Sequence, residues 1–406
     1  MGAVAGQPVL LVLASTYPRW YGDPEPAFVH ELSRRLLDDY EVHVITPHFS
    51  GALRNEILDG VRVHRFLYAP VAWETLVSNG GMLANLKRTP LKWLLVPGFL
   101  VAMLFSLLRL QVLLKPAVIH VHWIIPQGLV VALSSLIRRA CPVVLTSHGA
   151  DLYSLKGGLL MGIKRWILRH IDQLTVVSSS MLSSASLLGI NSDRLRVLPM
   201  GVDLDARFTP GESPRSNNLL LFVGRLVEKK GLAHLLDALP ILRTRNPDLR
   251  LRVVGFGPLE QELKRQAEQL SLLDCIEFIG AVSQEQLVRH YREAAMLVAP
   301  FVRAENGDVE GLGLVAIEAI GCHCPVLLGD VPAVRDVLGD ASEWIVDPRD
   351  EEALISKINQ LLACPEEAQR RVSTLRNELY VRFSWQAATD SYRRLFLSLR
   401  TGQGEC

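Results

Sequence analysis

Short apolar runs recur along the 406-residue chain, and helix-length stretches separate them. Continuous runs of Val, Leu and Ile in this arrangement are typical of parallel strands that are buried on both faces. The first series predicts strands at Val9–Ala14, Glu41–Thr46, Val61–Phe66, Val118–Val121, Val143–Thr146, Leu174–Val177 and Arg196–Leu198. The second series predicts strands at Leu219–Val223, Leu251–Val254, Ile276–Ile279, Met296–Ala299, Pro325–Leu328 and Trp344–Val346. Two such series predict an α/β fold with two Rossmann-like domains.

A polar stretch separates the two series. Residues Thr209–Asn218 are rich in Pro, Gly, Ser and Asn, which is typical of a linker. We therefore expect a first domain over residues 1–205 and a second over residues 206–384.

The bulk composition excludes some partners. With 43 basic and 42 acidic residues the net charge is +1, which argues against nucleic acid as a partner. The six cysteines have no disulfide-framework spacing, so a reducing cytoplasm is the expected setting. The first apolar run is too short for a secretory signal and no basic residue precedes it, so we expect no leader.

One short motif has residues that could ligate a metal. Cys322-His323-Cys324 offers three ligands, yet no second ligand pair follows at the spacing of a zinc finger. We interpret the motif as the start of a buried strand and predict no metal site.

The segment from Trp93 to Leu114 is mostly apolar. It is preceded by three basic residues, Lys87, Arg88 and Lys92. Its length suits a transmembrane helix, but Pro97-Gly98 and the in-line Arg109 argue against one. Two interpretations stay open: a core helix of the first domain, or a basic, aromatic-bearing helix that lies on an anionic membrane.

Within the stretch Asp308–Ala319, the carboxylates Glu310 and Glu318 lie eight positions apart. Gly311 and Gly313 fall where the loop after strand 296–299 should become a helix. A helix N-terminus presents free N–H groups and positive charge, which suits a phosphate, and glycine lets a ligand approach closely. Because eight helical residues span about 12 Å, the two carboxylates could hold groups on either side of a diphosphate.

Two cations follow the first strand of the second domain. Gly224 ends that strand, and Arg225 and Lys230 lie five positions apart on the loop after it. A guanidinium binds phosphate oxygens with a planar fork, and an ammonium adds a compact charge. We predict that both bind phosphate and interpret the neighbouring Lys229 as a solvated side chain.

A glycine pair also follows the next strand of this domain. Gly255-Phe-Gly257 begins like a dinucleotide-binding fingerprint but lacks the third glycine. A turn close to a nucleotide and a plain strand-to-helix turn are both open.

In the first domain, His148 and Gly149 come directly after a predicted strand, with Asp151 close behind. The carboxyl ends of strands in open α/β sheets bind ligands, so His148 is a candidate site residue. His122 holds the equivalent position one strand earlier, but the Trp and Ile that follow it indicate packing. The loop after the first strand, which contains Tyr17, could frame an acceptor or simply tether the next helix.

In their order along the chain, these motifs resemble the retaining glycosyltransferases of family four, which have the GT-B fold. The matching landmarks are His148-Gly149-Ala-Asp151, Pro199-Met-Gly-Val-Asp203 with Phe208, Gly224-Arg-Leu…Lys230-Gly231, the Glu310…Glu318 pair, and Phe383-Ser-Trp385…Tyr392. The resemblance covers nearly the whole chain. It implies two Rossmann-like domains with parallel sheets facing across a cleft, and a C-terminal helix, residues 385–401, that packs back on the first domain.

The resemblance implies that the second domain binds a nucleotide-diphosphate sugar and that the first binds a glycan or lipid-linked acceptor. It places Arg225 and Lys230 on the diphosphate, and Glu318 on the ribose. It gives Glu310 and His148 catalytic positions at the sugar. The phosphate cradle is completed by the amides of Gly311, Leu312, Gly313 and Leu314. The acceptor-side candidates are Tyr17, Asp151 and His122.

The family mechanism is a front-face reaction in which the leaving phosphate helps to deprotonate the acceptor. The resemblance therefore implies no metal, no cofactor and no enzymatic nucleophile. An apolar first domain fits a lipid-linked or polysaccharide acceptor and peripheral contact with the inner face of a membrane.

One loop departs from the family pattern, because Trp20–Pro26 has a single glycine where many members have a pair. Three other functions are alternatives for this chain: a nucleotide-sugar epimerase on the same frame, an NAD-dependent oxidoreductase that uses residues 255–257, and an inactive scaffold. The missing third glycine argues against the oxidoreductase. The presence of both glutamates and both cations argues against the scaffold.

Overall fold

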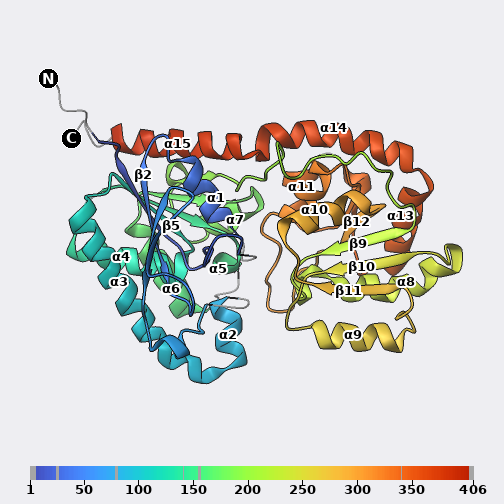
Figure 1. The fold of residues 1–406 in the computed structure, drawn as a ribbon, viewed down its shortest axis with the longest axis horizontal. Coiled ribbons are helices and arrows are strands. Elements are labelled where there is room, and N and C mark those ends of the chain that lie inside the picture. Colours follow the sequence, from blue (N-terminus) through green and yellow to red (C-terminus); the bar gives the residue numbers. More distant parts are fainter. Residues whose placement is uncertain are drawn as a thin grey trace. The chain divides into compact units, whose positions relative to one another are not determined.

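The structure is a computed structural model that describes residues 6–23, 27–77, 81–139, 141–153, 157–339 and 341–401. The chain forms two compact units. The first comprises residues 1–177, 181–200 and 388–406, and the second comprises residues 178–180 and 201–387. Each unit is a sheet with helices packed on it (Figure 1).

The first unit has one mainly parallel sheet. Its strands are β1 (Val9–Leu13), β2 (Glu41–Pro47), β3 (Asn55–Leu58), β4 (Val61–Phe66), β5 (Val118–His122), β6 (Val143–Ser147), β7 (Gln173–Val176) and β8 (Leu195–Val197). Their order in space is β3-β4-β2-β1-β5-β6-β7-β8, and only β3 runs antiparallel to its neighbour. The chain fills one side of β1 first and then crosses to β5, so the strand order reverses between β1 and β5.

The second unit has a fully parallel sheet in its described residues. Its strands are β9 (Leu219–Val223), β10 (Arg250–Val254), β11 (Ile276–Gly280), β12 (Met296–Ala299), β13 (Val326–Gly329) and β14 (Ile345–Val346). Their order is β11-β10-β9-β12-β13-β14, so the strand order reverses between β9 and β12. Ligands of open α/β sheets bind at such a switch point, beyond the carboxyl ends of the strands.

Three of the described helices begin at recognisable sequence signals. Ser283 and Gln286 form a reciprocal capping box at the start of α10, and the Asp350 side chain accepts a hydrogen bond from Ala353 N at the start of α13. Pro365 occupies the first turn of α14. The helices are α1 (Phe28–Arg35), α2 (Met82–Arg88), α3 (Leu95–Leu114), α4 (Leu129–Ile137), α5 (Ala150–Tyr153), α6 (Gly158–Arg169), α7 (Ser180–Ser186), α8 (Leu232–Arg245), α9 (Glu260–Gln269), α10 (Gln284–Glu293), α11 (Leu314–Gly321), α12 (Val334–Leu338), α13 (Glu351–Ala363), α14 (Pro365–Phe383) and α15 (Trp385–Thr401).

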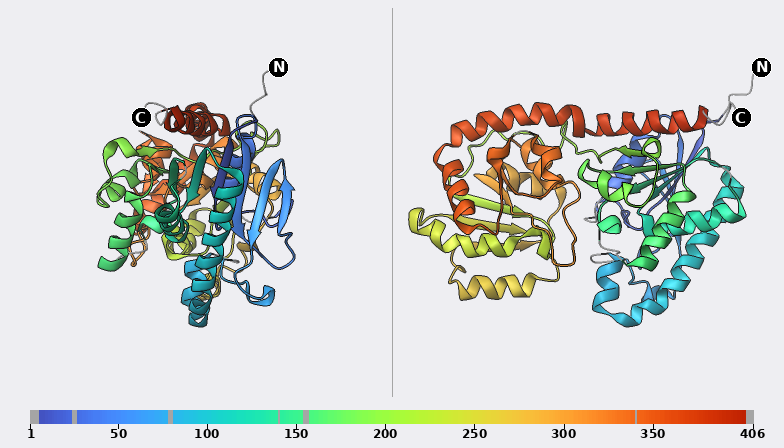
Figure 2. Two further views of the ribbon diagram at one scale, coloured as in Figure 1. Left: turned by 90° about the vertical axis from the view of Figure 1, so that its left-hand side faces the viewer. Right: turned by 180° about the vertical axis from the view of Figure 1, so that it is seen from behind.

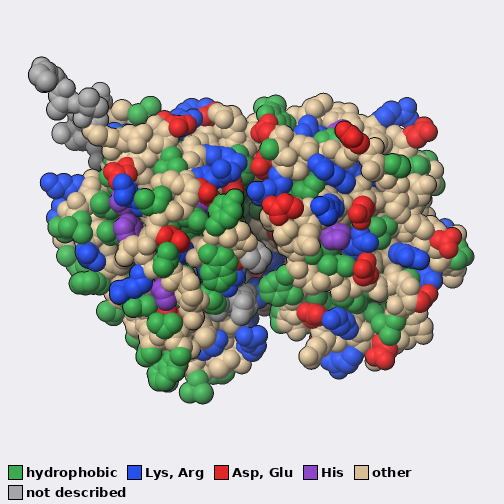
Figure 3. Space-filling model, in the orientation of Figure 1, with side chains coloured by type: hydrophobic (Ala, Val, Ile, Leu, Met, Phe, Trp, Pro, Cys, Tyr) green, Lys and Arg blue, Asp and Glu red, His purple; other side chains and the backbone are tan. Residues whose placement is uncertain are grey.

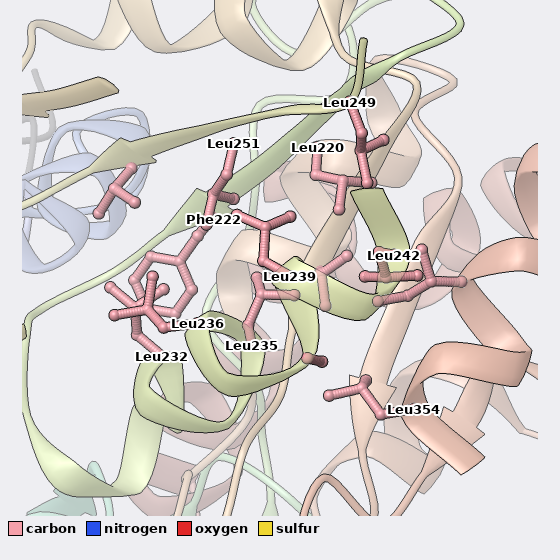
Figure 4. Packing of buried hydrophobic residues seen from close by; sticks show 14 of the residues in the cluster. Leu220, Phe222, Leu232, Leu235, Leu236, Leu239, Leu242, Leu249, Leu251 and Leu354 are labelled. Atoms are coloured by element: carbon pink, nitrogen blue, oxygen red, sulfur yellow. The ribbon is translucent and has the colours of Figure 1, made fainter. Parts of the chain in front are cut away.

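One core layer of the second unit lies between its sheet and the helices α8, α9 and α13. Leucines of α8 at helical spacing, among them Leu235, Leu239 and Leu242, are fully buried against Phe222 of β9 and Leu251 of β10 (Figure 4). Burial of each such side chain contributes roughly 1.5–3 kcal/mol. This packing fixes β9, and therefore the loop that follows it.

The last helix of the chain contributes to the core of the first unit. From residue 388 onward α15 belongs to that unit. The Tyr392 hydroxyl lies 3.2 Å from Thr146 Oγ1 of β6, and the Phe396 ring packs edge-on against His120 of β5. Arg393 Nε donates to Asp39 Oδ2 at 2.6 Å. The helix is thus tied to the first unit by both apolar and polar contacts.

The strands agree closely with the runs in the sequence. Each predicted strand is present with bounds that differ by at most one residue at either end. The structure adds β3, an antiparallel edge strand whose residues are mostly solvent-exposed and so carry no apolar run. Cys322-His323-Cys324 is not the start of a strand: these residues form the turn between α11 and β13, and β13 begins at Val326.

The predicted linker is wrong. The chain crosses between the units at residues 200–201, five positions before the predicted boundary, and Thr209–Asn218 lies within the second unit. The Arg215 guanidinium donates to the carbonyls of Tyr291, Arg292, Ala294 and Cys322. These contacts fix a segment whose composition alone is typical of a flexible connection.

We therefore expect Arg215→Ala to destabilise the second unit by about 2 kcal/mol, because it leaves several partly buried carbonyls without a donor. Urea unfolding followed by circular dichroism measures the effect. Glu212→Ala, at an exposed position of the same segment, is the matched control. Equal stability of the two variants would mean that the segment behaves as a linker after all.

Candidate active site

Two loops meet at the switch point of the second sheet. One follows β9 and contains Gly224, Arg225 and the short 3₁₀ helix Glu228–Lys230. The other follows β12 and runs over residues 300–313 to the start of α11. Because β9 and β12 are parallel neighbours, both loops leave the same edge of the sheet.

An ion pair joins the two loops. Lys230 Nζ lies 2.8 Å from Glu310 Oε2, and the two side chains are only 13% and 14% exposed. The same ammonium lies 4.8 Å from the centre of the Phe301 ring, within the range of a cation–π contact. Lys230 and Glu310, which belong to separate sequence motifs, therefore lie together at the edge of the sheet.

The ion pair sets the protonation state of Glu310. Burial by itself would raise the pKa of this carboxyl, but Lys230 and Lys229, with a backbone hydrogen bond from Gly313, outweigh it. The pKa of Glu310 is lowered to about 2. Glu310 is thus an ionised hydrogen-bond acceptor at any physiological pH.

A second ion pair lies directly beside the first. Lys229 Nζ lies 3.2 Å from both carboxylate oxygens of Asp308 and 3.3 Å from the Val309 carbonyl. Its side chain is 18% exposed, so the interpretation of Lys229 as solvated is wrong. Asp308, which had no predicted role, holds Lys229 and also accepts a hydrogen bond from Val309 N. Together these contacts clamp the two loops.

The N-terminus of α11 faces the same edge. Gly313 is the N-cap of α11, has φ +81°, and gives way to Leu314 as the first helical residue. A side chain at this φ would be strained, and no side-chain cap bonds the first turn. Gly311 and Leu312 lie buried just before it. The first-turn N–H groups of α11 are thus not capped by a side chain, as an anion site requires.

Only one of the two carboxylates is on the helix. Glu318 lies on α11, whereas Glu310 lies on the loop before it. The helical rise of 1.5 Å per residue therefore does not set their separation, contrary to the expectation from spacing.

Glu318 has a partner that the sequence did not reveal. The Tyr291 hydroxyl of α10 donates to Glu318 Oε2 at 2.8 Å, and Tyr291 is fully buried. Burial raises the pKa of Glu318 to about 7, against the lowering effect of the Tyr291 hydrogen bond and of Lys230. The two glutamates thus differ: Glu310 is always ionised, and Glu318 titrates near neutrality.

Arg225 follows Gly224 directly and is half-buried. Its loop packs tightly against the loop after β10, because Leu226 N donates to Phe256 O at 3.0 Å. A Cβ at Gly255, whose φ is +132°, would lie 2.0 Å from Gly224 O. This close approach explains Gly255 without a ligand and favours the plain-turn interpretation of Gly255-Phe-Gly257.

In the first unit, two of the candidate residues meet. His122 ends β5 and His148 follows β6, and His122 Nδ1 lies 3.0 Å from His148 Nε2. Burial lowers the pKa of His148 to about 3, and burial together with the neighbouring imidazoles lowers the pKa of His122 well below its usual value. Both rings are therefore neutral at physiological pH.

Because both rings are neutral, a hydrogen bond between His122 Nδ1 and His148 Nε2 requires that one of these two nitrogens carries a proton and the other accepts. His122 Nε2 is buried and has no partner among the described residues. A buried acceptor without a partner is less costly than a buried N–H without one, so we assign the shared proton to His122 Nδ1. His148 then accepts at Nε2 and carries its own proton on Nδ1. The half-buried His148 can thus donate a hydrogen bond to a ligand oxygen.

Two acceptor-side candidates are occupied within the unit. Asp151 is buried and accepts hydrogen bonds from Ile124 N at 2.7 Å and from Ser147 Oγ at 2.8 Å. The buried Tyr17 hydroxyl lies 2.7 Å from His30 Nδ1. These contacts favour structural roles for Asp151 and Tyr17 over the predicted contacts with an acceptor.

Within the described residues, no group of three or more His, Cys, Asp or Glu side chains is placed to hold a metal ion. The charge that this site offers to a phosphate comes from Lys230, Arg225 and the start of α11.

Two family models match the chain. The model described as Glycosyltransferase Family 4 matches residues 27–206, and the model described as Glycosyl transferases group 1 matches residues 205–377. The chain belongs to glycosyltransferase family 4. The two matches follow each other without a gap, and the second contains both ion pairs and α11.

Curated relatives of this glycosyltransferase include sugar transferases. The chain is 34% identical over 255 residues to the GDP-mannose-dependent alpha-(1-6)-phosphatidylinositol monomannoside mannosyltransferase of Mycolicibacterium smegmatis, a match that covers 58% of this chain and 65% of that relative. It is 27% identical to the glycogen synthase of Mycobacterium tuberculosis over 77% of this chain and 76% of that one. The chain thus spans just under two thirds of the length of the first relative.

Solved structures share the fold. The glycosyltransferase matches sucrose-phosphate synthase from Thermosynechococcus elongatus with a TM-score of 0.75 and 21% identity, over 97% of this chain and all of that one. It matches Anabaena HepE, solved in complex with UDP and glucose, with a TM-score of 0.73 and 15% identity over the same shares. These matches show the GT-B fold, with two Rossmann-like α/β domains.

The titration of Glu318 predicts how nucleotide binding depends on pH. If its ionised form accepts hydrogen bonds from a ligand, binding must remove the proton, so affinity falls by up to about tenfold per pH unit below the free pKa of about 7. Calorimetric titration with a nucleoside diphosphate from pH 5.5 to about 8.5 would show this. Glu318→Gln should bind more weakly and keep only the pH dependence that the terminal phosphate of the ligand, whose second pKa is about 6, contributes.

Tyr291→Phe provides a sharper test, because it changes only the partner of Glu318. Loss of the donated hydrogen bond raises the pKa of Glu318, so the midpoint of the pH dependence should move upward. Tyr380→Phe, at a partly exposed tyrosine of α14, is the control. An unchanged midpoint in Tyr291→Phe would show that Glu318 does not govern the titration.

Proposed function

We propose that this glycosyltransferase moves a sugar from a nucleotide-diphosphate sugar to a glycan or lipid-linked acceptor. The reaction retains the configuration at the anomeric carbon, needs no metal, and follows a front-face path. The observation that carries the proposal is the Lys230–Glu310 ion pair, held beside the uncapped start of α11 at the switch point of the second sheet.

The site suits a ligand with a diphosphate between two hydroxyl-rich groups. Lys230, Arg225 and the first turn of α11 supply positive charge for the diphosphate. Glu310, ionised throughout, accepts hydrogen bonds from sugar hydroxyls on one side. Glu318, on the helix, accepts hydrogen bonds from the ribose on the other.

The proposed reaction exchanges one bond for another at the anomeric carbon. The bond from this carbon to the diphosphate oxygen breaks, and the acceptor oxygen bonds to the same face. The acceptor proton passes to the departing phosphate oxygen, and a nucleoside diphosphate leaves. Lys230 and Arg225 stabilise the charge that develops on that oxygen, the role that a metal plays in other enzymes.

The relatives support this class of reaction without fixing its specificity. The mycolicibacterial relative is named for GDP-mannose and a phosphatidylinositol mannoside, and the structurally similar HepE was solved with UDP and glucose. These names differ in base and sugar, so the donor of this chain is a matter for experiment. A lipid-linked acceptor agrees with the apolar surface of the first unit described below.

Substitution of the adjacent Lys229 and Lys230 should distinguish a role in the reaction from a role in holding the loops. Lys230→Ala and Glu310→Gln should each lower transfer at least about 100-fold, because each removes a group that acts on the reacting sugar phosphate. Lys229→Ala should lower transfer by roughly tenfold or less, because Lys229 clamps the loops and adds to the positive charge beside Glu310 but forms its ion pair with Asp308. Initial rates with a radiolabelled donor, with and without a chelator, measure these effects.

Circular dichroism of each variant should match the unmodified chain, so that lost activity is not lost folding. Retained transfer in Glu310→Gln would refute the site assignment, and loss of transfer on adding the chelator would refute metal independence. Conversion of the donor to another sugar nucleotide without release of nucleoside diphosphate would identify an epimerase instead.

A thermal-shift panel of sugar nucleotides should identify the donor. A ligand that binds only the folded state stabilises it by about 2.7 kcal/mol at a hundredfold excess over its dissociation constant. One base and sugar should therefore raise the melting temperature of the unmodified chain by more than the others do. The same ligand should not raise the melting temperature of Lys230→Ala. An equal rise in that variant would mean that the ligand binds away from Lys230.

A further inference from the structure

The helix α3 is apolar on both of its faces. It is long and apolar enough to cross a membrane by length and composition. One face is part of the core of the first unit: Phe99, Met103 and Leu107 are buried, and the Phe99 ring packs edge-on against Phe66 and Tyr68 at 5.2 Å. A helix that packs this way cannot also span a bilayer without leaving the unit.

The opposite face of α3 is exposed, although it too is apolar. Val101 and Phe105 lie one turn apart and are 67% and 70% exposed. The neighbouring α4 packs beside α3 and exposes further apolar side chains at its end. We define the α3 face as the exposed apolar residues Leu91, Trp93, Leu94, Val101, Phe105, Val112, Leu113, Leu136 and Ile137.

The α3 face lies on the outside of the first unit. In Figure 2, α3 runs along the outer edge of that unit in the right-hand view and lies in front of the sheet in the left-hand view. Figure 3 shows hydrophobic side chains along the edge where Figure 1 draws α2 and α3, with basic side chains beside them. Exposed apolar side chains gathered on this scale are typical of a docking site. This confirms neither earlier interpretation alone, because α3 is a core helix on one face and a surface helix on the other.

The sequence segment that carries most of the α3 face has charges of one sign. Residues 75–150 contain no Asp or Glu and seven Lys or Arg, whereas the chain as a whole has 42 acidic residues. The basic residues are Lys87, Arg88, Lys92, Arg109, Lys115, Arg138 and Arg139. Among the described residues, Lys87, Arg88, Lys92, Arg109 and Lys115 form no ion pair with a carboxylate, so their charge is not neutralised within the chain.

We propose that the α3 face and its basic residues dock the glycosyltransferase on the surface of an anionic lipid bilayer. The apolar side chains enter the headgroup boundary while Lys and Arg contact anionic lipids, the arrangement of an interfacial helix. A second copy of the chain is disfavoured as the occupant, because a symmetric pairing would bring two sets of these cations together. The basic residues therefore favour a negatively charged partner, and the exposed apolar side chains favour a lipid surface.

The test is cosedimentation of the full chain with lipid vesicles. Vesicles of phosphatidylcholine alone are compared with vesicles that also contain phosphatidylglycerol, at low and at high salt. Because each basic residue near an anionic surface contributes about fivefold in affinity, Lys87→Glu/Arg88→Glu should weaken binding by at least about 25-fold. Val101→Ser/Phe105→Ser should weaken it at every salt concentration. All four positions are exposed, so the folded state should be little affected.

Matched variants on the second unit control for charge and hydrophobicity as such. Arg245→Glu/Arg265→Glu and Leu273→Ser/Val381→Ser alter residues that are also exposed. Binding to phosphatidylglycerol vesicles that both α3-face variants lose and both controls keep supports the proposal. The test needs no sugar or acceptor, so its result is independent of the proposed function.

Four results would overturn it: equal binding to neutral and anionic vesicles, no binding to either, unchanged binding of the α3-face variants, or resistance of bound protein to alkaline carbonate, which would indicate a spanning helix. Sedimentation velocity without lipid addresses the second copy. A dimer that Val101→Ser/Phe105→Ser converts to a monomer would also overturn it.

Discussion

The contact between Lys230 and Glu310 is the interaction on which the site depends. The two side chains come from loops that follow neighbouring parallel strands, so the sheet must be formed before they can meet. Each is largely removed from water, and removal of either partner would leave a charge that burial disfavours. The clamp of Lys229 on Asp308 holds the same two loops together. The buried leucines of α8 pack against β9 and so fix the start of the loop that carries Lys230. The geometry of the site therefore depends on the packing of the core.

The sequence predicts the sheets well and the site in part. Strands buried on both faces must be apolar along their whole length, which is why runs such as Leu219–Val223 could be located from composition. The start of α11 at Gly313–Leu314 could be predicted because glycine and a following apolar run mark a helix entry. Lys230 and Glu310 could be assigned to one site through the family resemblance, and the parallel pairing of β9 and β12 explains why they meet.

The sequence could not show hydrogen-bond partners that only the three-dimensional fold brings together. Tyr291 gives no local sign that it bonds Glu318, which lies 27 positions away. The segment around Arg215 has the composition of a linker, and that composition does not reveal that Arg215 donates to carbonyls on separate elements. Asp151 follows His148 closely, yet its carboxylate turns to Ile124 N and Ser147 instead. The uniform apolarity of α3 does not reveal which of its faces the sheet buries.

A crystal structure of the full chain with the nucleoside diphosphate that stabilises it most would test the central claim most directly. The account predicts diphosphate oxygens within hydrogen-bonding distance of Lys230 Nζ and of the first-turn N–H groups of α11, with the ribose at Glu318. A diphosphate bound at another edge of the sheet, with the Lys230–Glu310 pair left untouched, would contradict it.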